Sequence, residues 1–375
     1  MNNILIEFED ELLEHFKNTY RHCLNKSAIL TYQLVLNETL KELQYANYNG
    51  EELSSLKAWF DKIYDQRFLY DLMFHPFNEI IIHSNYHVQI ILSDDKKNIE
   101  LNELSLDEYQ LALETLCLKN NIVWNYKDPF ASFNITINQK NLRCTLIHSS
   151  TSSTKKSKVF MRFIKDESIA LKHFIPSHNN CEELIKTLIK EKANIIVAGS
   201  TGSGKTTFIR SLIDLISEDE HLITLEDTYE IINHRRNQTS LLADKNAPNK
   251  TLKDFCSYAL RMSPDRLIVG EIRSNEIVPF ILAMNTGHKG LLSSIHANSA
   301  ADTLSRLSLL FSLYSESTDV DFKTINKLIC KNVDAIVFIE NKKIKEIIKL
   351  IGSDGENPFF ELIYSNLSLK ESAHV

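Results

Sequence analysis

The stretch NIIVAGSTGSGKTTFIRSLIDLI, residues 194–216, decides the fold of this 375-residue chain. It opens with a short apolar run, continues with the octet GSTGSGKT and ends in a segment whose apolar residues recur at helical spacing. The octet fits the pattern G-x-x-x-x-G-K-[ST] at every fixed position, and this pattern marks a phosphate-binding loop where it joins a strand to a helix. The stretch therefore predicts strand, loop and helix in an α/β domain that binds a nucleotide.

Three glycines, Gly199, Gly202 and Gly204, allow the loop to adopt positive φ angles and to bring backbone N–H groups close to phosphate oxygens. Lys205 is expected to bridge the β- and γ-phosphates, and Thr206 to offer its hydroxyl to Mg²⁺. ATP with Mg²⁺ is the expected ligand. The predicted nucleotide-binding residues are Gly199, Ser200, Thr201, Gly202, Ser203, Gly204, Lys205, Thr206 and Thr207.

Around this loop, short apolar strands alternate with amphipathic helices from residue 181 to about residue 310. That alternation predicts a parallel sheet covered by helices on both faces. Upstream, isoleucine-rich alternation over residues 78–92 predicts a hairpin in a smaller α/β domain, and residues 1–70 read as helices. The predicted domains are a helical segment (1–70), an α/β domain (71–165), a linker (166–180) and the nucleotide-binding domain (181–375).

Two apolar strands end in acids, Glu271 after RLIVG and Glu226 after LITL. Because parallel strands bring their carboxyl ends to one edge of the sheet, both acids are expected near the phosphates. Glu271 is predicted to hold Mg²⁺ or its waters, and Glu226 to orient the attacking water and accept its proton. The alternative for the second segment is structural, with Asp227 or Thr228 capping a short turn and Glu230 in its first turn.

Two histidines flank the strand GLLSSIHA, His288 before it and His296 at its end. If this strand lies beside the one that ends at Glu271, His296 reaches the phosphate edge of the sheet. There it is predicted to sense the γ-phosphate through a hydrogen bond. For His288, at the opposite end of the strand, an interface role and a structural role are both open.

Phosphoryl transfer also needs fixed positive charge close to the γ-phosphate oxygens. Arg261 and Arg266 bracket the sequence MSPD, and Arg261 is the candidate for a catalytic arginine that a neighbouring subunit supplies. The arginines considered are Arg235, Arg236, Arg261, Arg266 and Arg273.

Composition sets bounds on the function. The net charge of −7 disfavours a protein whose whole surface binds nucleic acid. The six cysteines are far apart and form no C-x-x-C pair, which disfavours a zinc ribbon or a disulfide framework. No apolar run reaches the ~18 residues needed to span a bilayer. The N-terminal stretch is acidic where a signal peptide would be basic, so we expect a cytoplasmic protein, or one that docks on the membrane from that side.

Four blocks of the chain together resemble the type II/type IV secretion ATPase family. They are the GSTGSGKT loop, the acidic segment TLEDTYEI, the strand segment ALRMSPDRLIVGEIR and the histidine segment NTGHKGLLSSIHANSAADTLSRL, in the family's order. The resemblance is firm from about residue 181 to residue 310 and fainter over residues 69–165. It is greatest to the branch of tight-adherence (Tad) pilus motors and conjugative type IV secretion ATPases.

The resemblance implies an ATPase that works as a homohexamer. In each protomer, a small N-terminal α/β domain would be joined by a flexible linker to a RecA-like motor domain. Nucleotide would bind between the two domains, with Arg143 and Arg162 reaching toward it from the N-terminal domain. The family's partners are inner-membrane platform proteins of a pilus or secretion system, so peripheral attachment to the cytoplasmic membrane and no nucleic acid are expected.

Two other functions are compatible with a nucleotide-binding core of this kind. One is a RecA-like motor that translocates nucleic acid, which the net charge of −7 and the lack of an aromatic–basic cluster disfavour. The other is a scaffold that binds ATP without hydrolysing it, which the presence of Glu226, Glu271 and His296 disfavours.

Overall fold

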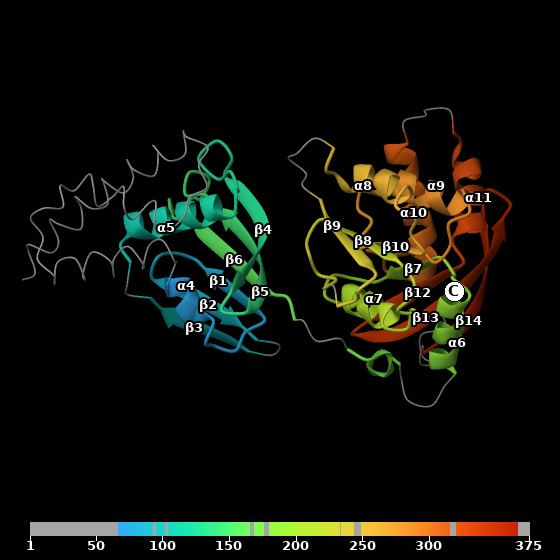
Figure 1. Cartoon of the computed structure of the whole chain (residues 1–375), viewed down its shortest axis with the longest axis horizontal. Coiled ribbons are helices and arrows are strands. Elements are labelled where there is room, and N and C mark those ends of the chain that lie inside the picture. Colours follow the sequence, from blue (N-terminus) through green and yellow to red (C-terminus); the bar gives the residue numbers. More distant parts are fainter. Residues whose placement is uncertain are drawn as a thin grey trace, which may run out of the picture. The chain divides into compact units, whose positions relative to one another are not determined.

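The elements of the chain fall into two units (Figure 1). The boundary between the units follows Lys165. The computed structural model describes residues 67–92, 95–101, 104–165, 169–175, 180–232, 234–243, 249–315 and 320–366. The helices predicted before residue 67 lie outside the described residues. Among the helices that the structure does describe, none has the length and apolar character needed to cross a membrane.

The first unit is built on a six-stranded sheet of order β3-β2-β1-β6-β5-β4, in which all neighbouring strands are antiparallel. Helix α5 buries Tyr109, Leu113 and Leu116 in the core of this unit. The described elements are α4 (Arg67–Leu72), β1 (Glu79–Ile82), β2 (His87–Ile91), β3 (Lys96–Glu100), α5 (Leu106–Lys119), β4 (Phe130–Ile137), β5 (Lys140–Ile147) and β6 (Lys158–Phe163).

The predicted hairpin over residues 78–92 is confirmed as β1 and β2. The alternation in its sequence follows from burial, because Ile80 and Ile82 are fully buried while Glu79 and Ile81 are partly exposed. Strand β3 was not predicted, since its sequence KKNIE is polar and largely exposed at the edge of the sheet.

The second unit contains an eight-stranded sheet of order β14-β13-β12-β7-β11-β10-β8-β9. The six strands from β12 to β9 in this order run parallel, and β13 and β14 add antiparallel strands at one edge. The strands are β7 (Ile195–Ala198), β8 (Leu222–Glu226), β9 (Gln238–Leu242), β10 (Arg266–Val269), β11 (Leu292–Ile295), β12 (Ala335–Glu340), β13 (Lys343–Ser353) and β14 (Pro358–Ser365).

Helices cover both faces of this sheet, as the alternation of apolar strands and amphipathic helices predicts. The cluster on one face includes Ile185 of α6 and Phe208 of α7, and that on the other includes Phe280 of α9 and Leu307 of α10. The helices are α6 (Cys181–Lys190), α7 (Lys205–Ile213), α8 (Leu252–Ala259), α9 (Ile277–Asn285), α10 (Ala300–Tyr314) and α11 (Phe322–Asn332).

Part of the predicted linker packs into the second unit. Residues Leu171–His173 form a turn of 3₁₀ helix, and Leu171 and Phe174 are buried in the core beside α7. The Phe174 ring meets the Phe208 ring edge-on, with 5.2 Å between centroids. The backbone N–H of Ile344 donates to the Phe174 carbonyl oxygen at 2.8 Å, so this segment is fixed to the start of β13.

A buried ion pair lies at the N-terminal end of the central strand β10. The Arg266 guanidinium is 2% exposed and donates to both carboxylate oxygens of Glu220, at 2.8 and 3.1 Å. It also donates to the Ile189 carbonyl oxygen at 2.9 Å. Gly290 lies against this side chain with φ of +70°, and a β-carbon there would come within 2.6 Å of Arg266 Cδ. Arg266 is therefore part of the structural framework.

Candidate functional site

The loop between β7 and α7 has the backbone that its glycines predict. Gly199, Gly202 and Gly204 have φ angles of +155°, +74° and +99°. A β-carbon on Gly199 would lie 2.3 Å from the Ile339 carbonyl oxygen, so no larger residue fits there. Gly204 is the N-cap of α7, and the free N–H groups of the first helical turn follow it. This geometry suits an anion at the helix N-terminus.

Lys205 is folded back into the loop. Its ammonium group donates to the carbonyl oxygens of Gly199 and Ser200, at 2.9 and 3.0 Å, and the side chain is largely buried. Burial lowers the pKa of the Lys205 ammonium. Among the described residues the buried Ser203 hydroxyl has no hydrogen-bond partner. A buried hydroxyl without a partner fits a loop that closes on phosphate oxygens. Thr206 follows Lys205 in the first turn of α7.

Strand β11 lies between β7 and β10, which confirms the expected neighbourhood of Glu271 and His296. His296 Nε2 is 2.8 Å from Glu271 Oε1, and His296 Nδ1 is 3.4 Å from Lys205 Nζ. Burial, and then the charge of Lys205, lower the pKa of His296. A lowered pKa favours the neutral imidazole at pH 7, and a neutral ring nitrogen can accept a hydrogen bond from the ammonium group of Lys205.

Glu271 Oε1 is buried and, within the described part of the chain, has no aligned hydrogen-bond donor despite the nearby imidazole. A carboxylate oxygen in this state fits a site that takes Mg²⁺ or its waters. The described residues contain no group of three or more histidine, cysteine or acidic side chains able to hold a metal ion. Mg²⁺ in such a site would share its coordination between Thr206, Glu271 or its bound water, and the phosphates of a nucleotide.

Arg273 joins two of the strand ends and was not singled out among the candidate arginines. Its guanidinium contacts the Glu271 carboxylate and lies 3.0 Å from Asp227 Oδ2, directly after β8. A continuous set of charged and polar side chains thus runs from Lys205 through His296, Glu271 and Arg273 to Asp227. The sequence feature that could have indicated this role is the position of Arg273, two residues after Glu271.

Glu226 has a separate environment. Its side chain is 4% exposed, and Oε1 accepts the backbone N–H groups of Glu230 and Ile231, both at 2.9 Å. Burial raises the pKa of the Glu226 carboxyl to about 7. The local structure of this segment therefore includes a turn capped by an acid, as the structural alternative proposed, but the capping residue is Glu226 itself.

The other candidate residues lie apart from the phosphate loop. Arg235 donates to the carbonyl oxygens of Ile213 and Ile216 at the end of α7, and Arg266 belongs to the buried ion pair described above. Arg261 is exposed after α8. His288 lies before β11, near the Thr286 hydroxyl, far along the strand from His296. These placements give Arg235 and Arg266 structural roles rather than the catalytic one considered for them.

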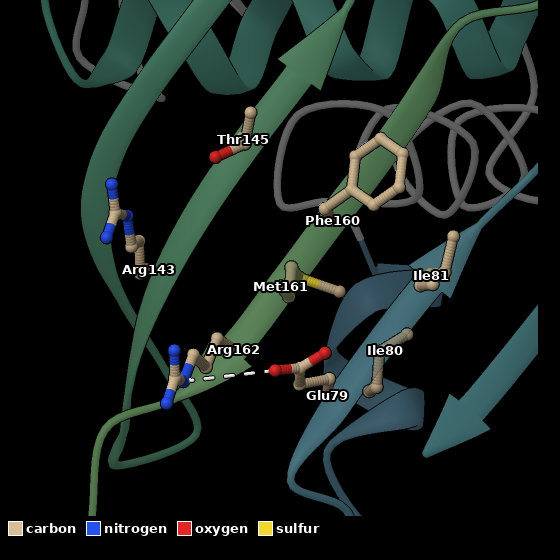
Figure 2. A pocket seen from close by; sticks show the side chains of 8 residues that line it. All are labelled: Glu79, Ile80, Ile81, Arg143, Thr145, Phe160, Met161 and Arg162. Carbon is tan, nitrogen blue, oxygen red and sulfur yellow. Dashed lines mark ion pairs between the residues drawn. The ribbon is translucent and has the colours of Figure 1, made fainter. Parts of the chain in front are cut away.

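Arg143 and Arg162 lie in the first unit, directly opposite each other on β5 and β6 (Figure 2). With Thr145, Phe160 and Glu79 they line a hollow of about 210 Å³. Arg162 Nε is 3.9 Å from Glu79 Oε1, and both side chains are about half exposed. The sheet therefore presents two guanidinium groups together on one of its faces.

The chain is similar to known proteins, and the matched family region contains the phosphate loop. The family described as Type II/IV secretion system protein matches residues 116–339, more than half of the chain. The type IV secretion system protein VirB11 of Bartonella quintana (strain Toulouse) is 32% identical over 164 residues, 43% of this chain and 46% of that protein. The conjugal transfer protein TrbB of Rhizobium radiobacter is 35% identical over 175 residues, 45% of this chain and 51% of that protein. The chain thus spans about half the length of these curated relatives.

Among solved structures, the crystal structure of the pilus retraction motor PilT with bound ADP has a TM-score of 0.56 to this chain. The two are 19% identical, and the match covers 81% of this chain and 84% of PilT. The similarity concerns the fold, an α/β unit followed by a RecA-like P-loop unit. Together with the matched family region, these observations show that the chain belongs to the type II/IV secretion system protein family.

Proposed function

We propose that this chain is a motor ATPase that hydrolyses ATP to drive a type IV secretion or pilus apparatus. The observation that carries the proposal is the set of charged and polar side chains from Lys205 to Asp227, which gathers at the strand ends beside the phosphate loop. Ligands of open parallel sheets bind at this edge. The names of the similar proteins, which include secretion and conjugal transfer proteins and a pilus motor, support the choice of process.

In this proposal, the backbone N–H groups of residues 199–207 and the N-terminus of α7 hold the phosphates. Lys205 leaves the carbonyl oxygens of Gly199 and Ser200 and bonds to the β- and γ-phosphates instead. Mg²⁺, when bound, neutralises charge that develops on the phosphate oxygens, and Thr206 and Glu271 are the residues that would hold it. Arg273 fixes the Glu271 carboxylate by its ion pair.

Glu226 is the proposed general base. Oε1 is held by two backbone N–H groups, and we assign Oε2 to the attacking water. The pKa of about 7 lies near the pH at which a general base works well, because base strength and the deprotonated fraction are then balanced. His296, neutral and next to Lys205, is the proposed sensor that exchanges its contacts when a γ-phosphate arrives or leaves.

The whole assembly is proposed to be a homohexamer at the cytoplasmic face of the inner membrane, in contact with platform proteins of the apparatus. Arg261 is the arginine proposed to act on the nucleotide of a neighbouring subunit. Arg143 and Arg162 are proposed to reach the nucleotide from the first unit, as paired guanidinium groups suit phosphate oxygens.

The test is phosphate release from ATP by the purified full-length protein and by the Lys205→Ala variant. We expect magnesium-dependent hydrolysis by the wild type and a loss of about 100-fold or more in the variant, since a charge essential to phosphate positioning is removed. Circular dichroism and thermal unfolding serve as the control for an intact fold. Lack of hydrolysis by a folded wild type, or full activity of the variant, would overturn the proposal.

A further inference from the structure

The turn between β12 and β13 places a lysine where glycine is the favoured residue. Asn341 and Lys342 form a two-residue hairpin turn, and both have positive φ angles, of 49° and 58°. Turns of this type favour Asn followed by Gly, because a side chain is strained in the left-handed region. The chain keeps Asn at the first position but carries Lys at the second.

This turn lies directly on the phosphate loop. The Lys342 N–H donates to the Ser203 carbonyl oxygen at 3.0 Å. A β-carbon built on Gly204 would lie 3.5 Å from Lys342 Cγ, so the lysine side chain passes beside the N-cap of α7. The Ile339 carbonyl oxygen, just before the turn, restricts Gly199 in the same way. Both ends of the loop therefore contact one hairpin.

The ammonium group of Lys342 has a different environment from those of the nearby lysines in the hairpin. Lys343 donates to the His173 carbonyl oxygen at 2.7 Å, and Lys345 pairs with Glu340 at 3.4 Å. Lys342 is exposed, and within the described residues its ammonium has no carboxylate partner. A lysine beside the N-cap of α7 adds positive charge where the helix N-terminus is already partly positive, and an anion bound there would be attracted by both.

We propose that Lys342 is a second cation for the phosphates of the nucleotide, supplied by the hairpin that follows β12. The inference rests on the proposed function and deepens it, because it assigns to the site a residue more than 130 positions beyond the phosphate loop. Lys205 and Lys342 then approach the polyphosphate from different elements of the same unit.

Replacement of Lys342 by glycine separates this role from a structural one. Lys342→Gly relieves the strained conformation and retains the N–H that bonds to Ser203, so the melting temperature is expected to stay equal or rise. At the same time, the Kd for ADP and for ATP, each with Mg²⁺ and measured by calorimetry, is expected to rise about fivefold or more, as one charged hydrogen bond is lost. The dependence of Kd on salt should become shallower.

Matched variants complete the test. Lys342→Gln should weaken nucleotide binding in the same way, and Lys342→Arg should restore most of it. Lys349→Gln removes an exposed lysine from β13 of the same hairpin, opposite Ala335 at the far end of β12, and should leave the Kd unchanged. Wild-type affinity in both Lys342→Gly and Lys342→Gln, with binding lost in Lys205→Ala, would overturn the inference while the proposed function stands. A wild type that binds no nucleotide would overturn both.

Discussion

At the scale of single residues, two glutamates that end strands of the same sheet have different chemistry because their surroundings differ. Glu271 shares its carboxylate with Arg273 and lies against His296. The Glu226 side chain is buried, its Oε1 accepts two backbone N–H groups, and burial raises its pKa to about 7. One acid is thus kept in place by charge, and the other has a proton affinity suited to proton transfer.

The Glu226 pKa leads to a prediction about stability. Because burial raises this pKa from 4.5 to about 7, the folded protein holds a proton that the unfolded chain has released between these values. Stability therefore falls as pH rises through this window. Glu226→Gln removes the ionisation and keeps an oxygen for the N–H groups of Glu230 and Ile231. We expect the free energy of unfolding of the variant to exceed that of the wild type at pH 8 by roughly 1–3 kcal/mol, with a much smaller difference at pH 5.

Urea denaturation at the two pH values, without nucleotide, measures this difference. Glu361→Gln, which changes an exposed glutamate on β14, is the control and should show no such pH dependence. The same variant at Glu226 should bind ATP with near wild-type affinity and hydrolyse it roughly 100-fold more slowly. An equal difference in stability at both pH values would show that the carboxyl is not buried as described.

The arginines mark the limit of what single residues in a sequence can predict. Arg235, Arg266 and Arg273 all looked eligible to balance phosphate charge. Their roles depend on partners brought near by the fold: the end of α7 for Arg235, Glu220 for Arg266, and Asp227 with Glu271 for Arg273. By contrast, Lys205, Glu271 and His296 could be placed together, because parallel strands bring their ends to one edge.

At the scale of elements, the central strands of the second unit were predictable and its edge strands β9 and β14 were not. Strands β7, β8, β10 and β11 are short and fully buried, so their sequences are continuous apolar runs. Strand β9 is half-exposed with the sequence QTSLL, and β14 is largely exposed. An edge strand is defined by hydrogen bonds to its neighbour, and these leave little trace in hydrophobic pattern.

The ion pair at the start of β10 gives a prediction at this scale. The pKa of Glu220 is lowered to about 2, first by its hydrogen bond from Arg266. Its stabilising effect is therefore complete above the unfolded value near 4.5 and is lost as pH falls toward 2. Glu220→Gln leaves a buried guanidinium without its counter-charge, so we expect a loss of about 3 kcal/mol at pH 7.

Chemical denaturation at pH 7 and near pH 3 checks this expectation, and the cost of the substitution should shrink at the lower pH. Glu218→Gln is the matched control, because this neighbouring carboxylate is 75% exposed and lies 3.5 Å from Arg235. Its removal should cost less than about 1 kcal/mol. Equal effects of the two substitutions would contradict the role of Glu220 in joining β10 to the rest of the unit.

At the scale of the whole molecule, the proposed ring makes Arg261 and Lys205 act on one nucleotide from different subunits. We expect native mass spectrometry with a non-hydrolysable ATP analogue and Mg²⁺ to show a six-fold species. Lys205→Ala and Arg261→Ala should each be nearly inactive alone. A mixed ring contains interfaces with both residues intact, so a mixture of the two variants should regain hydrolysis. A persistent monomer, or a mixture no more active than its components, would contradict the arrangement.

The contact of Phe174 with the β12–β13 hairpin has a mechanical consequence. The polypeptide that connects the two units is hydrogen-bonded to Ile344, and two residues earlier in the same hairpin the Lys342 N–H holds Ser203. A displacement of Phe174 would therefore reach Ser203 through these two backbone hydrogen bonds and the short stretch of hairpin between them.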